Sequence, residues 1–233
     1  MQKGRLYLIP TILAENATHT IPEYIKETVV STDYYIVENL KTARRFIKSI
    51  CKEKDIDACT FFELDKHRDY KLDESFLLKA FEGKNIGLLS DAGTPCIADP
   101  GNKVVQVAHE LDIEVVPLVG PSSILLALMG SGFNGQQFSF NGYLPIEQAE
   151  RKNKLLQMET AARKGNTQIF MDTPYRNVKL LEEMIKQLKY DTMLCIACNL
   201  TSSEEFIKTL PLAEWKNRKI DLHKKPAIFI LGK

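Results

Sequence analysis

The chain has 233 residues, and its 31 Lys and Arg residues nearly balance its 30 Asp and Glu residues, which leaves a formal net charge of +1. Its hydrophobic content of 44% and charged content of 26% exclude collagen-like, coiled-coil and disordered proteins. The near-neutral charge argues against binding of nucleic acid through the overall charge of the protein, so any such contact must come from a local basic patch. The length fits one large or two small domains.

No segment of the chain predicts a membrane span or a secreted protein. The apolar run after Met1–Arg5 stops at Pro10, which is too short for a signal peptide. The longest uninterrupted apolar stretch, Ile124–Met129, is far below the roughly 20 residues that cross a bilayer. The 5 cysteines are irregularly spaced and suit a reducing compartment. We therefore expect a soluble, cytoplasmic protein with no membrane partner.

The first half alternates β-branched runs with helical patterns, which is the signal for βαβ units in a parallel sheet. Asn85–Ser90 is too apolar for a solvated strand and should lie centrally in that sheet. Ser122 is expected to cap the last helix of this half. The predicted strands are Arg5–Thr11, Asp33–Asn39, Ala58–Leu64, Asn85–Ser90 and Ile113–Val119, and the predicted helices are Lys41–Lys54, Glu74–Phe81, Asn102–Leu111 and Ile124–Met129.

The pattern starts again after Gly130–Gly132, and Gly, Asn and Gln cluster around residues 133–136. We place a domain boundary there, which predicts two α/β domains at residues 1–134 and 135–233. The second half contains predicted strands at Gln137–Leu144, Thr167–Thr173, Thr192–Leu200 and Ala227–Gly232, predicted helices at Ala149–Lys164 and Arg176–Leu188, and two short segments at Glu204–Lys208 and Leu212–Lys216.

The most informative segment is the loop Ser90–Gly101, which follows the most apolar strand and precedes a helix. Ligands of open α/β sheets bind at the carboxyl ends of the strands. Paired glycines, prolines and aspartates give this loop a backbone set for close approach and acceptors for a hydroxyl or a cation. The alternative is a structural loop whose Asp91 and Asp99 only cap helices.

A second loop, Pro117–Ser123, also ends a strand and opens a helix. Its amides and hydroxyls can hold a polar ligand, or Ser122 can serve only as a helix cap. We expect the two loops to end neighbouring strands. Neither loop fits G-x-G-x-x-G or G-x-x-x-x-G-K-[ST], so a dinucleotide fingerprint and a Walker-A loop are rejected.

Ser90–Gly101 resembles the S-D-A-G-T-P…D-P-G signature of the tetrapyrrole methylase superfamily, in the form of its small-subunit rRNA cytidine 2′-O-methyltransferase branch. The porphyrinoid branches carry a Gly-Gly-Asp-Pro form instead, which disfavours a tetrapyrrole substrate. Other motifs of the rRNA branch occur in order over nearly the whole chain. They are Leu8–Thr11, Val116–Leu118, Gly120–Ser122, Gly142–Pro145, Thr173–Arg176 and Leu200–Thr201.

The resemblance implies S-adenosylmethionine as methyl donor in a cleft between two α/β domains, a homodimer, and ribosomal RNA or the small ribosomal subunit as partner. It also implies cofactor contacts, of which the last three below would meet the adenosine. These positions are Pro10, Asp91, Ala92, Gly93, Thr94, Ile97, Ser122, Ser123, Asp172, Leu200 and Ala227.

The chain departs from the branch in segments expected to face the substrate. Ile12–Asn16 replaces a glycine- and asparagine-rich stretch, Glu38–Lys41 replaces an acidic pair followed by Thr-Arg, and Cys198–Asn199 replaces an Arg-Glu pair. A module that binds the cofactor without catalysis is therefore an alternative. A hydroxyl acceptor needs a base within hydrogen-bond reach, and Glu38 and Asp91 are the candidate catalytic residues, although either can be structural.

Other chemistry-bearing patterns are weaker. Cys195 and Cys198 have C-x-x-C spacing, but residues three apart on a strand point to opposite faces, and the histidines lack ligand spacing, so no metal is expected. Basic clusters are either solvated faces or an RNA-binding patch. They are Lys41/Arg44/Arg45/Lys48, Arg151/Lys152/Lys154 and Arg218/Lys219/Lys224/Lys225.

Overall fold

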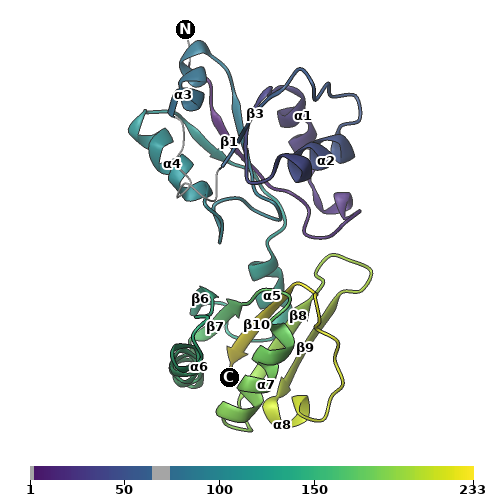
Figure 1. The fold of residues 1–233 in the computed structure, drawn as a ribbon, viewed down its shortest axis with the longest axis vertical. Coiled ribbons are helices and arrows are strands. Elements are labelled where there is room, and N and C mark those ends of the chain that lie inside the picture. Colours follow the sequence, from purple (N-terminus) through teal and green to yellow (C-terminus); the bar gives the residue numbers. More distant parts are fainter. Residues whose placement is uncertain (1–2, 65–73) are drawn as a thin grey trace. The chain divides into compact units, whose positions relative to one another are not determined.

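The computed structural model describes residues 3–64 and 74–233, and the chain divides into two units, Met1–Ser122 and Ser123–Lys233. Each unit has its own five-stranded sheet (Figure 1). The division falls earlier than the expected boundary at residues 134 and 135. The reason is that helix α5 (Ser123–Ser131) packs on strands β8, β9 and β10 of the second sheet.

The first sheet is entirely parallel and has the strand order β3-β2-β4-β1-β5. Strand β4 is buried along its whole length and lies in the middle, which confirms the prediction for this segment. The strands are β1 (Leu6–Ile9), β2 (Tyr34–Val37), β3 (Thr60–Glu63), β4 (Ile86–Leu89) and β5 (Val115–Pro117).

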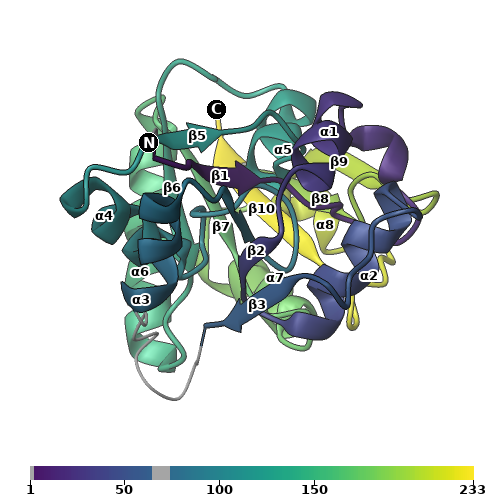
Figure 2. The ribbon, with the colours of Figure 1, turned by 90° about the horizontal axis from the view of Figure 1, so that it is seen from above.

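Helices cover both faces of this sheet, with α1 and α2 on one side and α3 and α4 on the other (Figure 2). Helix α1 was not predicted, because in seven residues it buries only Ile25 and Val29, too few for a periodic signal. Gly83, with φ 76°, ends the segment that was predicted as the helix Glu74–Phe81. The helices are η1 (Thr18–Thr20), α1 (Tyr24–Val30), α2 (Leu40–Ile50), α3 (Glu74–Leu77), η3 (Leu78–Glu82) and α4 (Gly101–Glu110).

The second sheet is mixed and has the order β6-β7-β10-β8-β9, with β10 antiparallel to both of its neighbours. The short segment expected at Glu204–Lys208 overlaps the start of an edge strand, β9, which pairs with β8. The strands are β6 (Phe138–Tyr143), β7 (Thr167–Met171), β8 (Met193–Cys198), β9 (Phe206–Pro211) and β10 (Ala227–Gly232).

The second core lies between this sheet and helices α6 (Gln148–Arg163), α7 (Asn177–Gln187) and α8 (Leu212–Trp215). Cys198 belongs to this core whereas Cys195 does not, so the two thiols lie on opposite faces of β8, as predicted. Within residues 3–64 and 74–233, no helix has the length and apolarity needed to cross a membrane.

Candidate functional site

Three loops of the first unit meet at one edge of its sheet, and we call them the first loop cluster: Pro10–Thr11, Ser90–Thr94 and Gly120–Ser122. They follow β1, β4 and β5, whose carboxyl ends share that edge because the strands are parallel. The prediction that the two longer loops end neighbouring strands is wrong, since β1 lies between β4 and β5. The loop after β1 therefore joins the other two.

Backbone contacts hold the first loop cluster together. The amide of Thr11 donates to the Gly93 carbonyl at 2.9 Å, and the Thr11 hydroxyl donates to the Ser90 carbonyl at 3.3 Å. A Cβ on Gly120 would lie 2.2 Å from the Cβ of Pro10. A Cβ on Gly93, which has φ +75°, would lie 3.1 Å from the Pro121 carbonyl oxygen. Gly120 thus leaves no room for a Cβ beside the Pro10 ring, and Gly93 is favoured by its positive φ as well as by the nearby carbonyl.

The turn Asp91–Thr94 contains polar groups that the described part of the chain does not use. Asp91 and Ala92 are exposed, Thr94 is half-buried and Gly93 is buried. The amides of Ala92, Gly93 and Thr94, and the carboxylate of Asp91, make no hydrogen bond to any part of the chain that the structure describes. Adjacent free amides form a concave donor site for anionic or carbonyl groups, and the carboxylate adds an acceptor. The turn is therefore suited to a ligand with both kinds of group.

Asp99, in contrast, has a structural role. Such a role was the alternative interpretation of both aspartates in the loop Ser90–Gly101. Its Oδ1 accepts from the amides of Cys96 at 3.0 Å and Gly101 at 2.7 Å, which fixes the loop at the start of α4. Burial raises the pKa of this carboxyl. The same stretch holds Cys96 and Ala98 at φ 70° and 64°, a left-handed backbone that side-chain-bearing residues rarely adopt. Ile97 lies between them and is exposed.

Glu38 links strand β2 to the first loop cluster. Its Oε1 accepts from the amide of Asp91 at 3.0 Å, across neighbouring strands β2 and β4. The structure thus brings the two predicted base candidates together and gives Glu38 a visible function, which is to hold the Asp91 backbone. The role of either carboxylate as a base stays a prediction.

The second unit has its own set of three segments at one sheet edge, the second loop cluster: Asp172–Arg176, Asn199–Thr201 and Lys224–Ala227. Ile228 pairs with Met171, and Ala227 pairs with Cys198, so the end of β7, the end of β8 and the start of β10 share this edge. The predicted positions Asp172, Leu200 and Ala227 are therefore brought to one edge by the register.

Backbone and side-chain hydrogen bonds join the segments of the second loop cluster. The amide of Asn199 donates to the Pro226 carbonyl at 3.0 Å, and the amide of Lys224 donates to the Pro174 carbonyl at 3.2 Å. The buried Asn177 side chain donates to the Lys225 carbonyl at 2.8 Å.

The polar groups of the second loop cluster are largely paired. Asp172 is buried, and its Oδ1 accepts from the Thr173 amide and from Arg176 Nε, each at 2.7 Å. Arg176 was not identified from the sequence as this partner. The available signal was the spacing of four residues between Asp172 and Arg176, at which oppositely charged side chains can pair. Thr201 has φ 69°, an outlier for a β-branched residue, and its hydroxyl is buried without a partner among the described residues.

Ser122 and Ser123 stand on either side of the division between the units. Ser122 follows Gly120 and Pro121 in the loop after β5, and Ser123 is the first residue of α5. In the described ranges, no group of His, Cys, Asp and Glu is placed to hold a metal ion.

Residues 12–216 match the family described as Tetrapyrrole (Corrin/Porphyrin) Methylases. The chain belongs to this family. As a member of it, the chain is a methyltransferase, and the predicted family is confirmed.

Two relatives sharpen the assignment. The chain is 32% identical to "Ribosomal RNA small subunit methyltransferase I" of Vibrio cholerae over 90% of its own length and 69% of the relative's. It is also 32% identical to the protein of the same name from Escherichia coli O157:H7, over 91% of this chain and 71% of that one.

Solved structures of tetrapyrrole methyltransferases share the fold of this methylase. One is uroporphyrin-III-C-methyltransferase from Thermus thermophilus, with a TM-score of 0.60, 13% identity and coverage of 99% of this chain and 95% of that one. Another is the methyltransferase CobJ, with a TM-score of 0.63 and 13% identity over 99% of this chain and 94% of that one. The predicted α/β fold class is confirmed.

Proposed function

We propose that this methylase transfers a methyl group from S-adenosylmethionine to a ribose 2′-hydroxyl of small-subunit ribosomal RNA. The observation that carries the proposal is the Asp91–Thr94 turn at the carboxyl edge of a parallel sheet, whose amides at Ala92–Thr94 and Asp91 carboxylate have no hydrogen-bond partner in residues 3–64 and 74–233. The names and the coverage of the relatives support ribosomal RNA as the acceptor.

The first loop cluster has the features that the donor requires. S-adenosylmethionine supplies a methyl group already activated on a sulfonium, so the chain has to bind the donor, orient it and exclude water. The amides of Ala92, Gly93 and Thr94 can donate to its carboxylate or hydroxyl oxygens, while Asp91 can accept from its hydroxyl or ammonium groups. Pro10, Ile97, Ser122 and Ser123 remain predicted contacts of the donor.

The second loop cluster is proposed to offer apolar surface and backbone groups to the adenosine. Leu200 and Ala227 are buried and apolar, and the Asp172 carboxylate already forms an ion pair with Arg176. Asp172 is therefore proposed to shape its loop for the donor and not to bind it through the carboxylate.

Deprotonation of a ribose hydroxyl needs an acceptor within about 3 Å in the reactive complex. Glu38 and Asp91 are the carboxylates proposed for this step. Because the Asp91 amide donates to Glu38, loss of the Glu38 carboxylate would also loosen the donor turn.

Calorimetry with S-adenosylmethionine and its demethylated product, followed by incubation of tritiated donor with ribosomal RNA from cells lacking the gene, tests the proposal. We expect donor binding and label in one RNA of the small subunit. Binding without label in any RNA would favour the second candidate, a non-catalytic cofactor-binding module, which the altered segments Ile12–Asn16 and Leu40–Lys41 support. No binding at millimolar donor would refute both.

We further propose that the protein acts in the cytoplasm, where its RNA substrate is made, and works as a homodimer. Light scattering of the purified protein measures the second point directly, and a monomer mass would refute it.

A further inference from the structure

Helix α2 has one strongly basic side. Its sequence, LKTARRFIKSI, contains four cations and no acid. The apolar residues Ala43, Phe46 and Ile47 are buried against the sheet, which leaves the cations outside. Lys41 and Arg45, one helical turn apart, are exposed and share that outer side.

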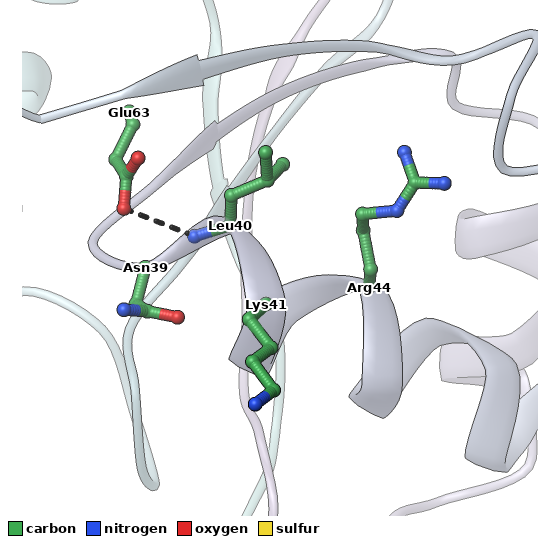
Figure 3. Close-up of a pocket in the computed structure, with 5 residues that line it drawn as sticks. All are labelled: Asn39, Leu40, Lys41, Arg44 and Glu63. Atoms are coloured by element: carbon green, nitrogen blue, oxygen red, sulfur yellow. Dashed lines mark hydrogen bonds between the residues drawn. The ribbon is translucent and has the colours of Figure 1, made fainter.

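This basic side begins beside the proposed donor site. Helix α2 starts two residues after Glu38, the residue that accepts from the Asp91 amide. A pocket of about 460 Å³ opens at this end of the helix, lined by Asn39, Leu40, Lys41, Arg44 and Glu63 (Figure 3). The Leu40 amide donates to Glu63 at 3.1 Å, which links the start of α2 to the end of β3 at the pocket wall.

The cations of α2 differ in how firmly they are held. Arg44 pairs with Asp57 at 2.5 Å and lies over the Phe61 ring, and Lys48 donates to the carbonyls of Lys52 and Lys54. Arg45 is 3.7 Å from Glu15, in an exposed pair of the kind that contributes little. Lys41 makes no ion pair with a described residue. Lys41 and Arg45 are thus available to a new anion.

The other basic clusters contain cations that are already used. Arg151 is buried and paired with Glu183, and Lys225 pairs with Asp221 and Glu204. Among the clusters named from the sequence, the one on α2 combines an unpaired Lys41 and a weakly paired Arg45, within the described residues, with a place at the carboxyl edge of the parallel sheet.

We propose that Lys41 and Arg45, together with the pocket at Asn39–Lys41, bind the phosphate backbone of the acceptor RNA beside the donor turn. This inference rests on the proposed function. It explains how a chain of net charge +1 holds a polyanion, since phosphate contacts need only a local patch. The apolar side chain of Leu40, 37% exposed, offers a surface for the adjoining sugar or base.

The test compares K41Q/R45Q with K152Q/K189Q, a control that removes two exposed cations from the second unit. Fluorescence anisotropy measures binding to labelled small-subunit ribosomal RNA as a function of salt, and calorimetry measures the affinity for S-adenosylmethionine. Thermal melting checks the fold of both variants.

For K41Q/R45Q we expect RNA affinity to fall roughly tenfold or more near 0.1 M salt. The slope of log K against log salt should become shallower by about 0.7–0.9 for each lost phosphate contact. Donor affinity and melting temperature should stay at the wild-type values, and the control should bind RNA like the wild type.

An unchanged RNA affinity and salt slope in K41Q/R45Q would overturn the inference, as would equal losses in the two variants. Failure of the proposed function looks different. In that case the wild type does not bind the donor or transfers no label to RNA, whatever the two double variants do to RNA affinity.

Discussion

Each of the two units contains a five-stranded sheet, but the polar groups at the loop-bearing edge are partly unpaired in the first unit and mostly paired in the second, among the described residues. In the first unit, the parallel strands bring three loops to one edge, and the turn Asp91–Thr94 has amides and a carboxylate without a hydrogen-bond partner among the described residues. In the second, the mixed sheet brings two strand ends and one strand start together, and Asp172 is neutralised by Arg176. Unused polar groups indicate binding, whereas paired buried groups indicate structure.

A buried ion pair extends this contrast within the second unit. Arg151 donates to both Glu183 oxygens, at 2.7 and 2.8 Å, and to the carbonyls of Pro145 and Ile146. The first unit has nothing equivalent among its described residues, where each ion pair has at least one exposed partner.

The largest effect on stability is therefore expected from Arg151→Ala. Removal of one partner leaves the Glu183 charge buried and uncompensated, which costs about 3–5 kcal/mol. Urea unfolding followed by far-UV circular dichroism measures the loss. R151M/E183L, which removes both charges, should recover much of it, and an equal loss in the double variant would contradict this account.

Asp91→Ala should weaken donor binding while leaving the fold intact. A hydrogen bond to a charged group contributes about 1.5–3 kcal/mol, so the affinity for S-adenosylmethionine should fall about ten- to hundredfold. Calorimetry measures the affinity, and scanning calorimetry measures the melting temperature.

Asp99→Ala is the matched comparison, because this aspartate holds the loop. It should lower the melting temperature, and donor affinity should fall only as far as the loop loosens. If Asp91→Ala instead kept its affinity and melted markedly earlier, the assignment of Asp91 to the ligand would be wrong.

Gly120→Ala should strain the first loop cluster, since the new Cβ would lie 2.2 Å from the Cβ of Pro10. Overpacking of this kind costs about 1–3 kcal/mol, and we expect donor affinity to fall with stability because the strained turn belongs to the proposed site. Gly135→Ala is the control, as its Cβ would meet nothing within 4 Å. Equal melting temperatures for the two variants would show that the loops can separate freely.

The smallest expected effect is a pH dependence from the Arg151–Glu183 pair. Arg151 holds the pKa of the Glu183 carboxyl below its ordinary value of 4.5. A depressed pKa stabilises the fold above the unfolded-state value, and this stability is lost as pH falls through the folded-state value. Unfolding free energy should therefore decline below about pH 4.5 in the wild type, and less steeply in Glu183→Gln. If the unfolding free energy fell equally steeply with pH in the wild type and in Glu183→Gln, the Arg151–Glu183 pair would not be the source of the pH dependence.

Much of the fold was predictable because its signals are local. The alternation of apolar runs and helical patterns predicted the parallel sheet, and the continuous apolar run Asn85–Ser90 predicted the central position of β4. Ser90–Gly101 identified the family, because its spacing of glycines, prolines and aspartates is a property of the sequence alone. Weak or short patterns failed, as for α1 and the edge strand β9.

What the sequence determined by itself is which segments form strands, which loop matters and which family the chain belongs to. Only the tertiary structure placed β1 between β4 and β5, attached α5 to the second sheet, and separated Asp91, which faces solvent, from Asp99, which binds its own loop. The physical reason is distance along the chain. Strand order and hydrogen-bond partners such as Glu38 and the Asp91 amide depend on which remote segments pack together, and no local pattern encodes that choice.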